Sequence, residues 1–428
     1  MANLPQGILP TLPCALPKAD LSSDTDAVGI AKGLNIPFSS LSLDHFTPDA
    51  LWRDTFALTG TLRTLYSAAA VLKAWNDRCR SRQAGSFQLS PDASRVVCPA
   101  AGIGWIEVPF IFETAAMPAT TCSGFVSLVP DGNGNWKIWL LRTILDQFQD
   151  LPNVDELEPG PAPTRQPLHE GAVYECLTSG TWDDNQRKWT LHLRQKQGEQ
   201  MTARTVTCSH VVMAIGAGGQ EPVRPFYPGE DLFQGDIIHT AQYKSPRPWQ
   251  GKHGVIIGSA NSGTLAADKQ QLSTPLAVSR LMSTLTLGAK IAQNPERFDA
   301  LERAGFKVDR GAEVVAHVHE RYGGHYIDVG NCANIAKGLV KVKSDSPLAR
   351  FTRTGLLFED DTHLPADVVV FATGYKGNAR DTVKELFGKE VYDRVEDYWG
   401  LDKEGEVRGA FKPSPRMLCT LLMSALFL

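Results

Sequence analysis

Apolar residues recur at helical spacing between Pro48 and Asp77, and this pattern predicts a helix. From residue 104 the pattern changes to short runs that are apolar or alternate between apolar and polar, namely "GWIEVPFIFET", "TTCSGFVSLVP" and "WKIWLLRTIL". The last two are separated by Asp131-Gly132 and Asn133-Gly134, which are typical residues of a hairpin turn. A helix followed by antiparallel strands predicts an α+β domain over residues 46–150.

The second half of the chain has a different texture. Residues 151–170 are rich in proline and acidic residues, which is typical of a linker. Two further strands are expected around a turn at Asp183-Asp184-Asn185, and helices are expected over residues 275–292 and 294–306. Three continuous apolar runs, "VVMAI", "GVII" and "DVVVF", each end in small residues, as parallel strands covered on both faces do. Residues 171–412 therefore predict an α/β, Rossmann-like region.

The run "GVII" leads directly into a glycine-rich turn and then into a helix-compatible segment. Strand, turn and helix in this order predict a dinucleotide-binding site, because the pyrophosphate lies against backbone N–H groups at the start of the helix. The alternative, a glycine-rich turn in some other α/β protein, stays open on this motif alone. The expected nucleotide-binding residues are Gly258, Ser259, Ala260, Asn261, Ser262 and Gly263.

A second motif lies between these apolar runs and narrows the class. It consists of Phe233, Gly235, His239, Tyr243 and Lys244. This spacing resembles the signature of flavin-containing monooxygenases, in the form found in indole-3-pyruvate monooxygenase-like proteins. Tyr243-Lys244 differs from the residues that Baeyer-Villiger monooxygenases carry at the same place. The resemblance therefore implies an oxidoreductase that uses FAD and NADPH to oxygenate a small organic substrate.

The resemblance also implies which residues lie where the two cofactors meet. They are Gly216, Ala217, Gly218, Gly219 and Gln220 after the first apolar run, and Ala372, Thr373 and Gly374 after the last. The five signature residues are expected to support this junction. No catalytic side chain is assigned, because in this class the cofactor supplies the chemistry and the protein binds and orients it.

The N-terminal half resembles the small cone-shaped SnoaL-like domain that precedes the monooxygenase module in some fungal relatives. A ligand pocket in this domain and a purely structural or dimerising role, which would make the protein a homodimer, are both open. Residues 1–45 are expected to form a loosely packed leader, because Pro5, Pro10, Pro13 and Pro17 interrupt any regular pattern. The apolar tail, residues 413–428, is too short to span a membrane as a helix.

One expected part of the family is missing from the sequence. A first GxGxxG inside a βαβ unit would bind the ADP half of FAD, and such a unit needs roughly 30 residues. The chain passes directly from the linker to a hairpin, so the Rossmann-like region is incomplete. Three hypotheses follow: a working oxygenase, an impaired homologue that binds only the nicotinamide nucleotide, and a non-enzymatic small-molecule binder. The preference for NADPH over NADH rests on the family alone.

Charge and cysteine content restrict the partners. The net charge is -4 and the chain has no basic block, so neither nucleic acid nor a membrane surface is expected as a partner. The eight cysteines form no CxxC pair, which indicates reduced thiols in a cytoplasmic protein and no metal site. With 43% hydrophobic and 21% charged residues, the composition is that of an ordinary globular protein.

Overall fold

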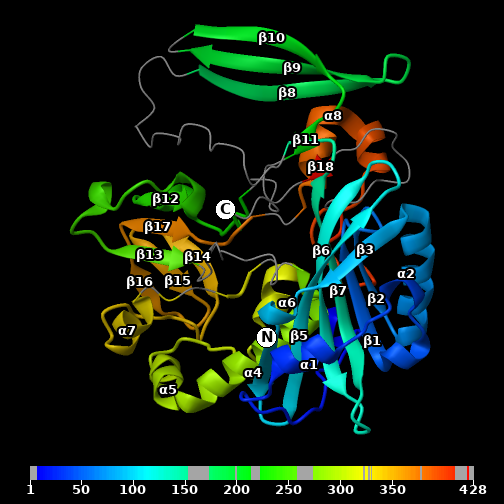
Figure 1. Ribbon diagram of the computed structural model, residues 1–428. Helices are drawn as coiled ribbons and strands as arrows, with labels where there is room; N and C mark the ends of the chain where they lie inside the picture. The colour runs from blue at the N-terminus through cyan, green and yellow to red at the C-terminus, as the bar shows by residue number, and fades with distance from the viewer. Residues whose placement is uncertain are drawn as a thin grey trace. The chain divides into compact units, whose positions relative to one another are not determined.

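The computed structural model (Figure 1) describes residues 7–152, 173–197, 200–213, 222–257, 273–321, 330–375, 378–409 and 422–423, together with 323–325 and 328. The chain divides into two units. Unit 1 comprises residues 1–214, 267–282 and 380–425, and unit 2 comprises residues 215–266, 283–379 and 426–428.

A seven-stranded sheet organises the N-terminal part of unit 1. Its strand order is β2-β1-β7-β6-β5-β3, and β4 pairs with β5. Strands β1 and β7 are parallel, and the other neighbours are antiparallel. The strands are β1 (Phe46–Thr55), β2 (Leu62–Tyr66), β3 (Ala84–Leu89), β4 (Arg95–Ala100), β5 (Ile103–Thr114), β6 (Thr120–Pro130) and β7 (Trp136–Phe148). The predicted hairpin of β6 and β7 is confirmed, with residues 131–135 as its loop.

The helix predicted between Pro48 and Asp77 is wrong for most of its length. The structure has β1 and β2 there, and α2 (Ala68–Arg82) begins only at Ala68. The reason is local. Along β1, Leu51 and Trp52 are both fully buried but belong to different apolar clusters, because successive side chains of a strand point to opposite faces. An apolar pair of this kind fits a helix and a doubly covered strand equally well.

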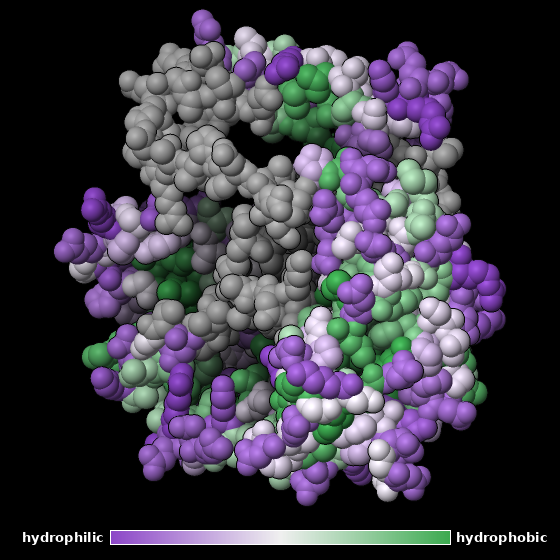
Figure 2. Space-filling model, viewed as in Figure 1, coloured by the Kyte–Doolittle hydropathy of each residue, from purple (hydrophilic) through white to green (hydrophobic). Residues whose placement is uncertain are grey.

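Aromatic side chains fill the core between this sheet and α2. Trp52 and Trp75 meet edge to face at 5.4 Å, and Phe87 stacks on Phe112 at 5.1 Å. The outward face of α2 is hydrophilic (Figure 2). Each buried aromatic residue adds a large apolar area to the core, and edge-to-face or offset stacking adds to that burial.

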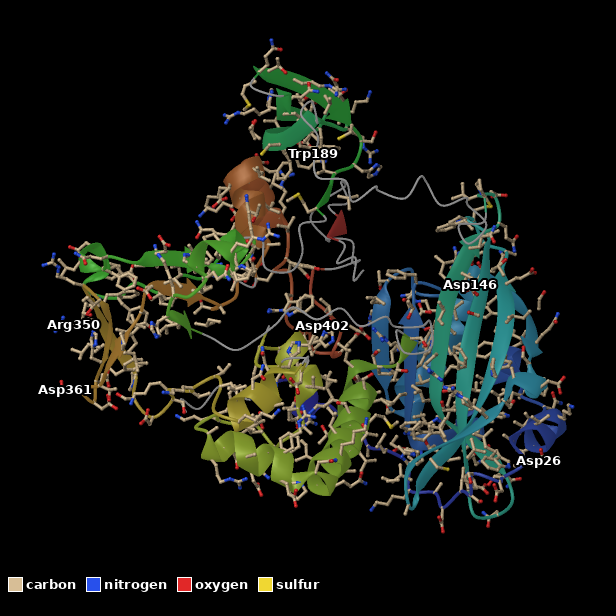
Figure 3. The ribbon with its side chains drawn as sticks, turned by 90° about the vertical axis from the view of Figure 1, so that its left-hand side faces the viewer. Asp26, Asp146, Trp189, Arg350, Asp361 and Asp402 are labelled. Carbon is tan, nitrogen blue, oxygen red and sulfur yellow. The ribbon has the colours of Figure 1, made fainter. Side chains whose placement is uncertain are left out.

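The segment before β1 packs into the same core. This segment runs from α1 (Ala27–Gly33), which begins directly after Asp26 (labelled in Figure 3), to η3 (Leu43–His45). Its buried side chains in the core are Ala27, Ala31, Phe38 and Leu41. Phe38 stacks on Phe110 at 4.7 Å, and its carbonyl accepts a hydrogen bond of 2.8 Å from Trp75 Nε1. We expected these residues in a loosely packed leader, because prolines and short 3-10 turns give no regular spacing of apolar residues.

The opposite face of the sheet is covered by later parts of unit 1. Leu51, Trp105, Trp139 and Leu140 form an apolar cluster with Val278, which lies in the first turn of α4 (Leu276–Gln293). A turn at residues 402–406 also lies on this face, because Tyr66 donates its hydroxyl hydrogen to the carbonyl of Glu404 at 2.8 Å. Segments far apart in sequence therefore complete one domain.

The same face buries charged side chains in pairs. Arg53 and Arg142 lie opposite each other on β1 and β7. Arg53 pairs with Glu406 at 2.8 Å, and Arg142 pairs with Glu107; all four side chains are at most 8% exposed. Burial lowers the pKa of Arg142, and the carboxylate of Glu107 opposes that shift. The pairing offsets the cost of removing these charges from water.

A second sheet in unit 1 is an antiparallel meander of order β10-β9-β8, made of β8 (Val173–Asp183), β9 (Lys188–Gln197) and β10 (Gln200–Cys208). Its first turn falls where the sequence predicts it. Trp189, labelled in Figure 3, is fully buried and meets Phe387 of α8 (Arg380–Arg394) edge to face at 5.1 Å. The short strands β11 (Val212–Met213) and β18 (Leu422–Met423) pair in parallel, so part of the apolar tail forms a strand.

Unit 2 holds a three-stranded parallel sheet of order β12-β17-β13. Its strands are β12 (Asp236–His239), β13 (Gly254–Ile257) and β17 (Val368–Phe371). An antiparallel sheet follows, of β14 (Leu348–Thr352), β15 (Gly355–Phe358) and β16 (His363–Pro365). The helices are α4, which continues from unit 1, α5 (Pro295–Arg303), α6 (Val314–His319) and α7 (Asn331–Ala336). Parallel strands with helices confirm the predicted α/β class.

Candidate functional site

The carboxyl ends of the three parallel strands of unit 2 lie in register. His239 ends β12, Phe371 ends β17 and Ile257 ends β13, and His239 and Ile257 both pair with Phe371. Three strand ends, of which the outermost in sequence are 132 residues apart, are thus brought to one edge. In open α/β sheets, ligands bind outside the carboxyl ends of the strands. This edge is therefore the candidate site.

The predicted turn Ala372-Thr373-Gly374 forms the middle of the edge. The N–H of Ala372 donates to the carbonyl of Ile257 at 2.7 Å, which ties the turn to β13. On the other side Thr373 donates its hydroxyl hydrogen to the carbonyl of Val223, and the N–H of Val223 donates to the carbonyl of Gly374 at 2.9 Å. The turn is held from both sides by backbone groups, so its position is fixed.

Gly374 leaves room at this edge. Its φ is +77°, a conformation that glycine adopts without strain, and among the described residues, its two chain neighbours apart, no heavy atom lies within 4 Å of the place that a Cβ would take. The next residue, Tyr375, is half-buried and forms a bridge to Pro222. A backbone with free space in front of it is what the close approach of a nucleotide needs.

His239 is the signature residue that lies at the edge. Its side chain is buried, with 3% of the residue exposed. The N–H of Ala241 donates to its Nδ1 at 3.1 Å, and the Tyr375 ring meets the imidazole edge to face at 5.7 Å. Its Nε2 has no hydrogen-bond partner among the described residues. A buried ring nitrogen with no partner, at the ligand-binding end of a sheet, is a donor or acceptor that a ligand could use.

The other signature residues have different roles. Gly235 lies against the neighbouring strand, since an added Cβ would stand 2.2 Å from the carbonyl oxygen of Asp367. Phe233 packs edge to face on Phe351 at 5.5 Å in the core of unit 2. Tyr243 stacks on Trp249 at 6.2 Å and is 46% exposed, and Lys244 is exposed. The structure thus brings His239 to the edge, while Gly235 and Phe233 hold the strand beneath it.

Sequence reasoning missed the residues that approach the edge from the segment before the signature. Tyr227 stacks on Phe371 at 6.3 Å, and the Arg224 guanidinium lies 5.6 Å from the same ring. Arg224 also pairs with Glu230 at 2.9 Å. The Arg224 cation thus lies beside the end of β17, where a phosphate would be favoured. In the sequence, only the position of Arg224 and Tyr227 between the first apolar run and the signature could have indicated them.

Two sets of predicted residues lie outside the described residues. They are the nucleotide-binding turn, Gly258 to Gly263, which directly follows β13, and Gly216 to Gln220, which precede Pro222.

The residues present fit a nicotinamide dinucleotide better than they fit a complete flavin site. The described edge offers an unpartnered buried nitrogen, open space at Gly374 and a nearby guanidinium. For the ADP half of FAD, a βαβ unit should precede these strands. Among the described residues before β12, the strands are those of the seven-stranded sheet, the antiparallel meander and the short β11.

Two further features of the described residues involve other side chains than those of the candidate edge. A hollow of about 520 Å³ lies on the meander and is lined by residues of β8, β9 and β10, none of which is a predicted site residue. In unit 2, His317 Nε2 lies 3.1 Å from Asp309 Oδ2, and burial together with His317 lowers the pKa of His325. Within the described ranges, no group of three His, Cys, Asp or Glu side chains could hold a metal ion. No helix in those ranges is both long and apolar enough to cross a bilayer.

Comparison with known proteins defines the class. Residues 178–294 match the family model described as flavin-binding monooxygenase-like. Indole-3-pyruvate monooxygenase YUCCA1 of Oryza sativa subsp. japonica is 25% identical over 285 residues, which cover 58% of this chain and 64% of that protein. Flavin-containing monooxygenase 2 of Homo sapiens is 28% identical over 219 residues, which cover 44% of this chain and 39% of that protein.

Solved structures give matches of lower similarity. The polycyclic ketone monooxygenase from the thermophilic fungus Thermothelomyces thermophila matches with a TM-score of 0.31 and 17% identity, covering 47% of each chain. The open structure of a cyclohexanone monooxygenase matches with a TM-score of 0.28 and 15% identity, covering 50% of this chain and 55% of that one.

The parallel sheet and its edge have the arrangement of a dinucleotide-binding α/β fold. The region that carries the signature is similar to the flavin-containing monooxygenase family, whose members are enzymes that use FAD and NADPH. The chain spans less than two thirds of the length of these curated relatives.

Proposed function

We propose that this chain is a flavin-dependent, NADPH-using monooxygenase that acts on a small organic substrate, in secondary metabolism and in the cytoplasm. The observation that carries the proposal is the register of β12, β17 and β13, which places His239, the Ala372 to Gly374 turn and the end of β13 at one edge. The family match of residues 178–294 supports it.

The chain's own residues would bind and orient the nicotinamide nucleotide. The turn after β13, Gly258 to Gly263, would hold the pyrophosphate through backbone N–H groups, and Arg224 would favour the negative charge. Gly374 would let the nucleotide approach the backbone. When bound, the flavin supplies electron transfer and oxygen activation. The protein's part is to fix the distance between the reacting groups and to exclude water.

A second candidate is an impaired homologue that keeps nicotinamide-nucleotide binding and cannot hold flavin. The sequence observation in its favour is the direct passage from the linker to β8, which leaves no room for a first βαβ unit. The third candidate, a small-molecule binder acting through the N-terminal domain, is weaker. Its support would be a cavity, whereas Phe38, Phe87, Phe110 and Phe112 stack on one another in that core. A structural or homodimerising role fits this filled core better.

One purification separates the three candidates. The full chain, purified after expression with excess riboflavin in the medium, is expected to be yellow, to show the absorption of bound flavin and to consume oxygen when NADPH is added. A colourless protein that binds NADPH in calorimetry supports the impaired homologue. A colourless protein that binds neither nucleotide, but whose melting temperature rises with an apolar ligand, supports the binder and overturns the oxidoreductase proposal.

A further inference from the structure

The unpartnered nitrogen of His239 carries an inference of its own. The N–H of Ala241 donates to Nδ1, so Nδ1 accepts and bears no hydrogen. In the neutral imidazole the hydrogen is then on Nε2, which makes Nε2 a donor. This donor is buried with 97% of the residue and has no partner among the described residues. Leaving a buried donor unpaired is unfavourable, so this donor lowers the stability of the unliganded protein.

The surroundings restrict what could satisfy the donor. His239 is the last residue of β12, level with Phe371 and, across β17, with Ile257. The Tyr375 ring already packs edge to face against the His239 imidazole. The backbone N–H of His239 is also occupied, because it donates to Gln242 Oε1 at 3.0 Å. The histidine is therefore fixed by three interactions at the ligand-binding end of the sheet, with only Nε2 left over.

We propose that His239 is a positioning residue for the nicotinamide nucleotide, and that its Nε2–H donates a hydrogen bond to an oxygen acceptor of that nucleotide. This inference rests on the proposed function, because it assigns a residue to the same site. The residue would orient the nucleotide and would take no part in bond making or breaking. The donor that destabilises the free protein would then stabilise the complex.

Two substitutions separate the two nitrogens. His239→Asn keeps an oxygen acceptor close to the position of Nδ1, so it can still accept from the Ala241 N–H, but it places no donor at the position of Nε2. His239→Gln extends an amide N–H to about the position of Nε2. His253→Asn is the matched control, because His253 precedes β13 at the opposite end of the same sheet and its side chain is 84% exposed.

The full-length protein is titrated with NADP⁺ in a calorimeter, and its melting temperature is measured without ligand. The Asn variant is expected to bind NADP⁺ about tenfold more weakly, while its melting temperature stays close to that of the wild type, because it keeps the acceptor for the Ala241 N–H and still buries an amide donor. The Gln variant is expected to regain affinity to within about threefold. The His253→Asn control should change neither quantity.

The outcomes distinguish the two proposals. If the wild type binds NADP⁺ and the Asn variant binds it equally well, the inference about His239 is overturned and the proposed function stands. An Asn variant that melts at a lower temperature with unchanged affinity shows that Nε2 serves the fold, and also overturns the inference. A wild type that binds no NADP⁺ overturns the proposed nucleotide site and this inference together.

Discussion

Two buried polar side chains, Asp54 in unit 1 and His239 in unit 2, differ in how completely their hydrogen bonds are satisfied. In the seven-stranded sheet domain, Asp54 is completely buried and accepts from Leu58 N, Thr59 N, Thr59 Oγ1 and Thr143 Oγ1 at 2.5–3.1 Å. At the edge of the parallel sheet, His239 is almost as buried, yet one of its two ring nitrogens has no partner among the described residues.

The difference separates a group that serves the fold from one that is available for a ligand. The four donors around Asp54 stabilise its charged form, although burial still raises the pKa of this carboxyl. These four hydrogen bonds use the acceptor capacity of the Asp54 carboxylate within the fold. A fully satisfied polar group specifies a structure, whereas a buried group with a donor left over can gain a partner from a ligand when it lies at a binding edge.

The largest effect is expected from Asp54→Ala. The substitution leaves the N–H groups of Leu58 and Thr59 and the Thr143 hydroxyl without their acceptor in a buried place, so we expect a loss of about 4 kcal/mol in the free energy of unfolding. Urea unfolding followed by tryptophan fluorescence measures it. The control is Asp92→Ala, an exposed carboxylate in the same domain, which should leave the unfolding curve unchanged. Equal effects of the two substitutions would contradict the comparison.

The second effect tests the charged pairs on the opposite face of the sheet. Glu406→Gln leaves the buried Arg53 cation without its counter-charge, and we expect a loss of about 3 kcal/mol. Glu404→Gln changes a pair on the same turn, with Arg63, in which the two side chains are 39% and 17% exposed. Solvent screens this pair, so the expected loss is about 1 kcal/mol. The same urea titration applies, and a loss for Glu404→Gln as large as that for Glu406→Gln would show that burial does not decide the effect.

The parallel sheet and the β6–β7 hairpin were predictable because their signals are local. Val255 to Ile257 and Val368 to Phe371 are continuous β-branched and apolar runs, and each is a strand of unit 2. Asp131-Gly132 marks a turn by its residue types alone. The turn of Ala372 to Gly374 was expected near the cofactors from the family resemblance, and the structure places it directly after β17, at the carboxyl edge of the sheet.

The remaining features depend on long-range register. Nothing near Arg142 in sequence shows that it lies opposite Arg53 or pairs with Glu107, because those partners come from other strands. The packing of Phe38 into the core was missed for the same reason, since its stacking partners are about 50 or more residues away. The unpaired Nε2 of His239 is likewise a property of burial, which one sequence does not display.

The third effect tests how closely the signature strand approaches its neighbour. Gly235→Ala would put a Cβ 2.2 Å from the backbone oxygen of Asp367, so β12 would have to move away from β17. We expect a loss of about 2 kcal/mol in the free energy of unfolding. Gly254→Ala is the matched control on β13, where the nearest atom to the added Cβ is 3.4 Å away, at Val368 Cγ1. Should both alanine variants unfold at the same urea concentration as the wild type, the strands are not held as closely as described.

The smallest effect concerns the turn at the edge itself. Thr373→Val removes the hydroxyl that donates to the Val223 carbonyl and keeps the shape of the side chain, so we expect a loss of about 1 kcal/mol. Thr373→Ser keeps the hydroxyl and should retain most of the wild-type stability. Differential scanning calorimetry of the three proteins measures the change. A Ser variant that is no more stable than the Val variant would show that the methyl group, and not the hydrogen bond, holds the turn. Apolar packing would then hold this turn in place, as it holds the core of the N-terminal domain.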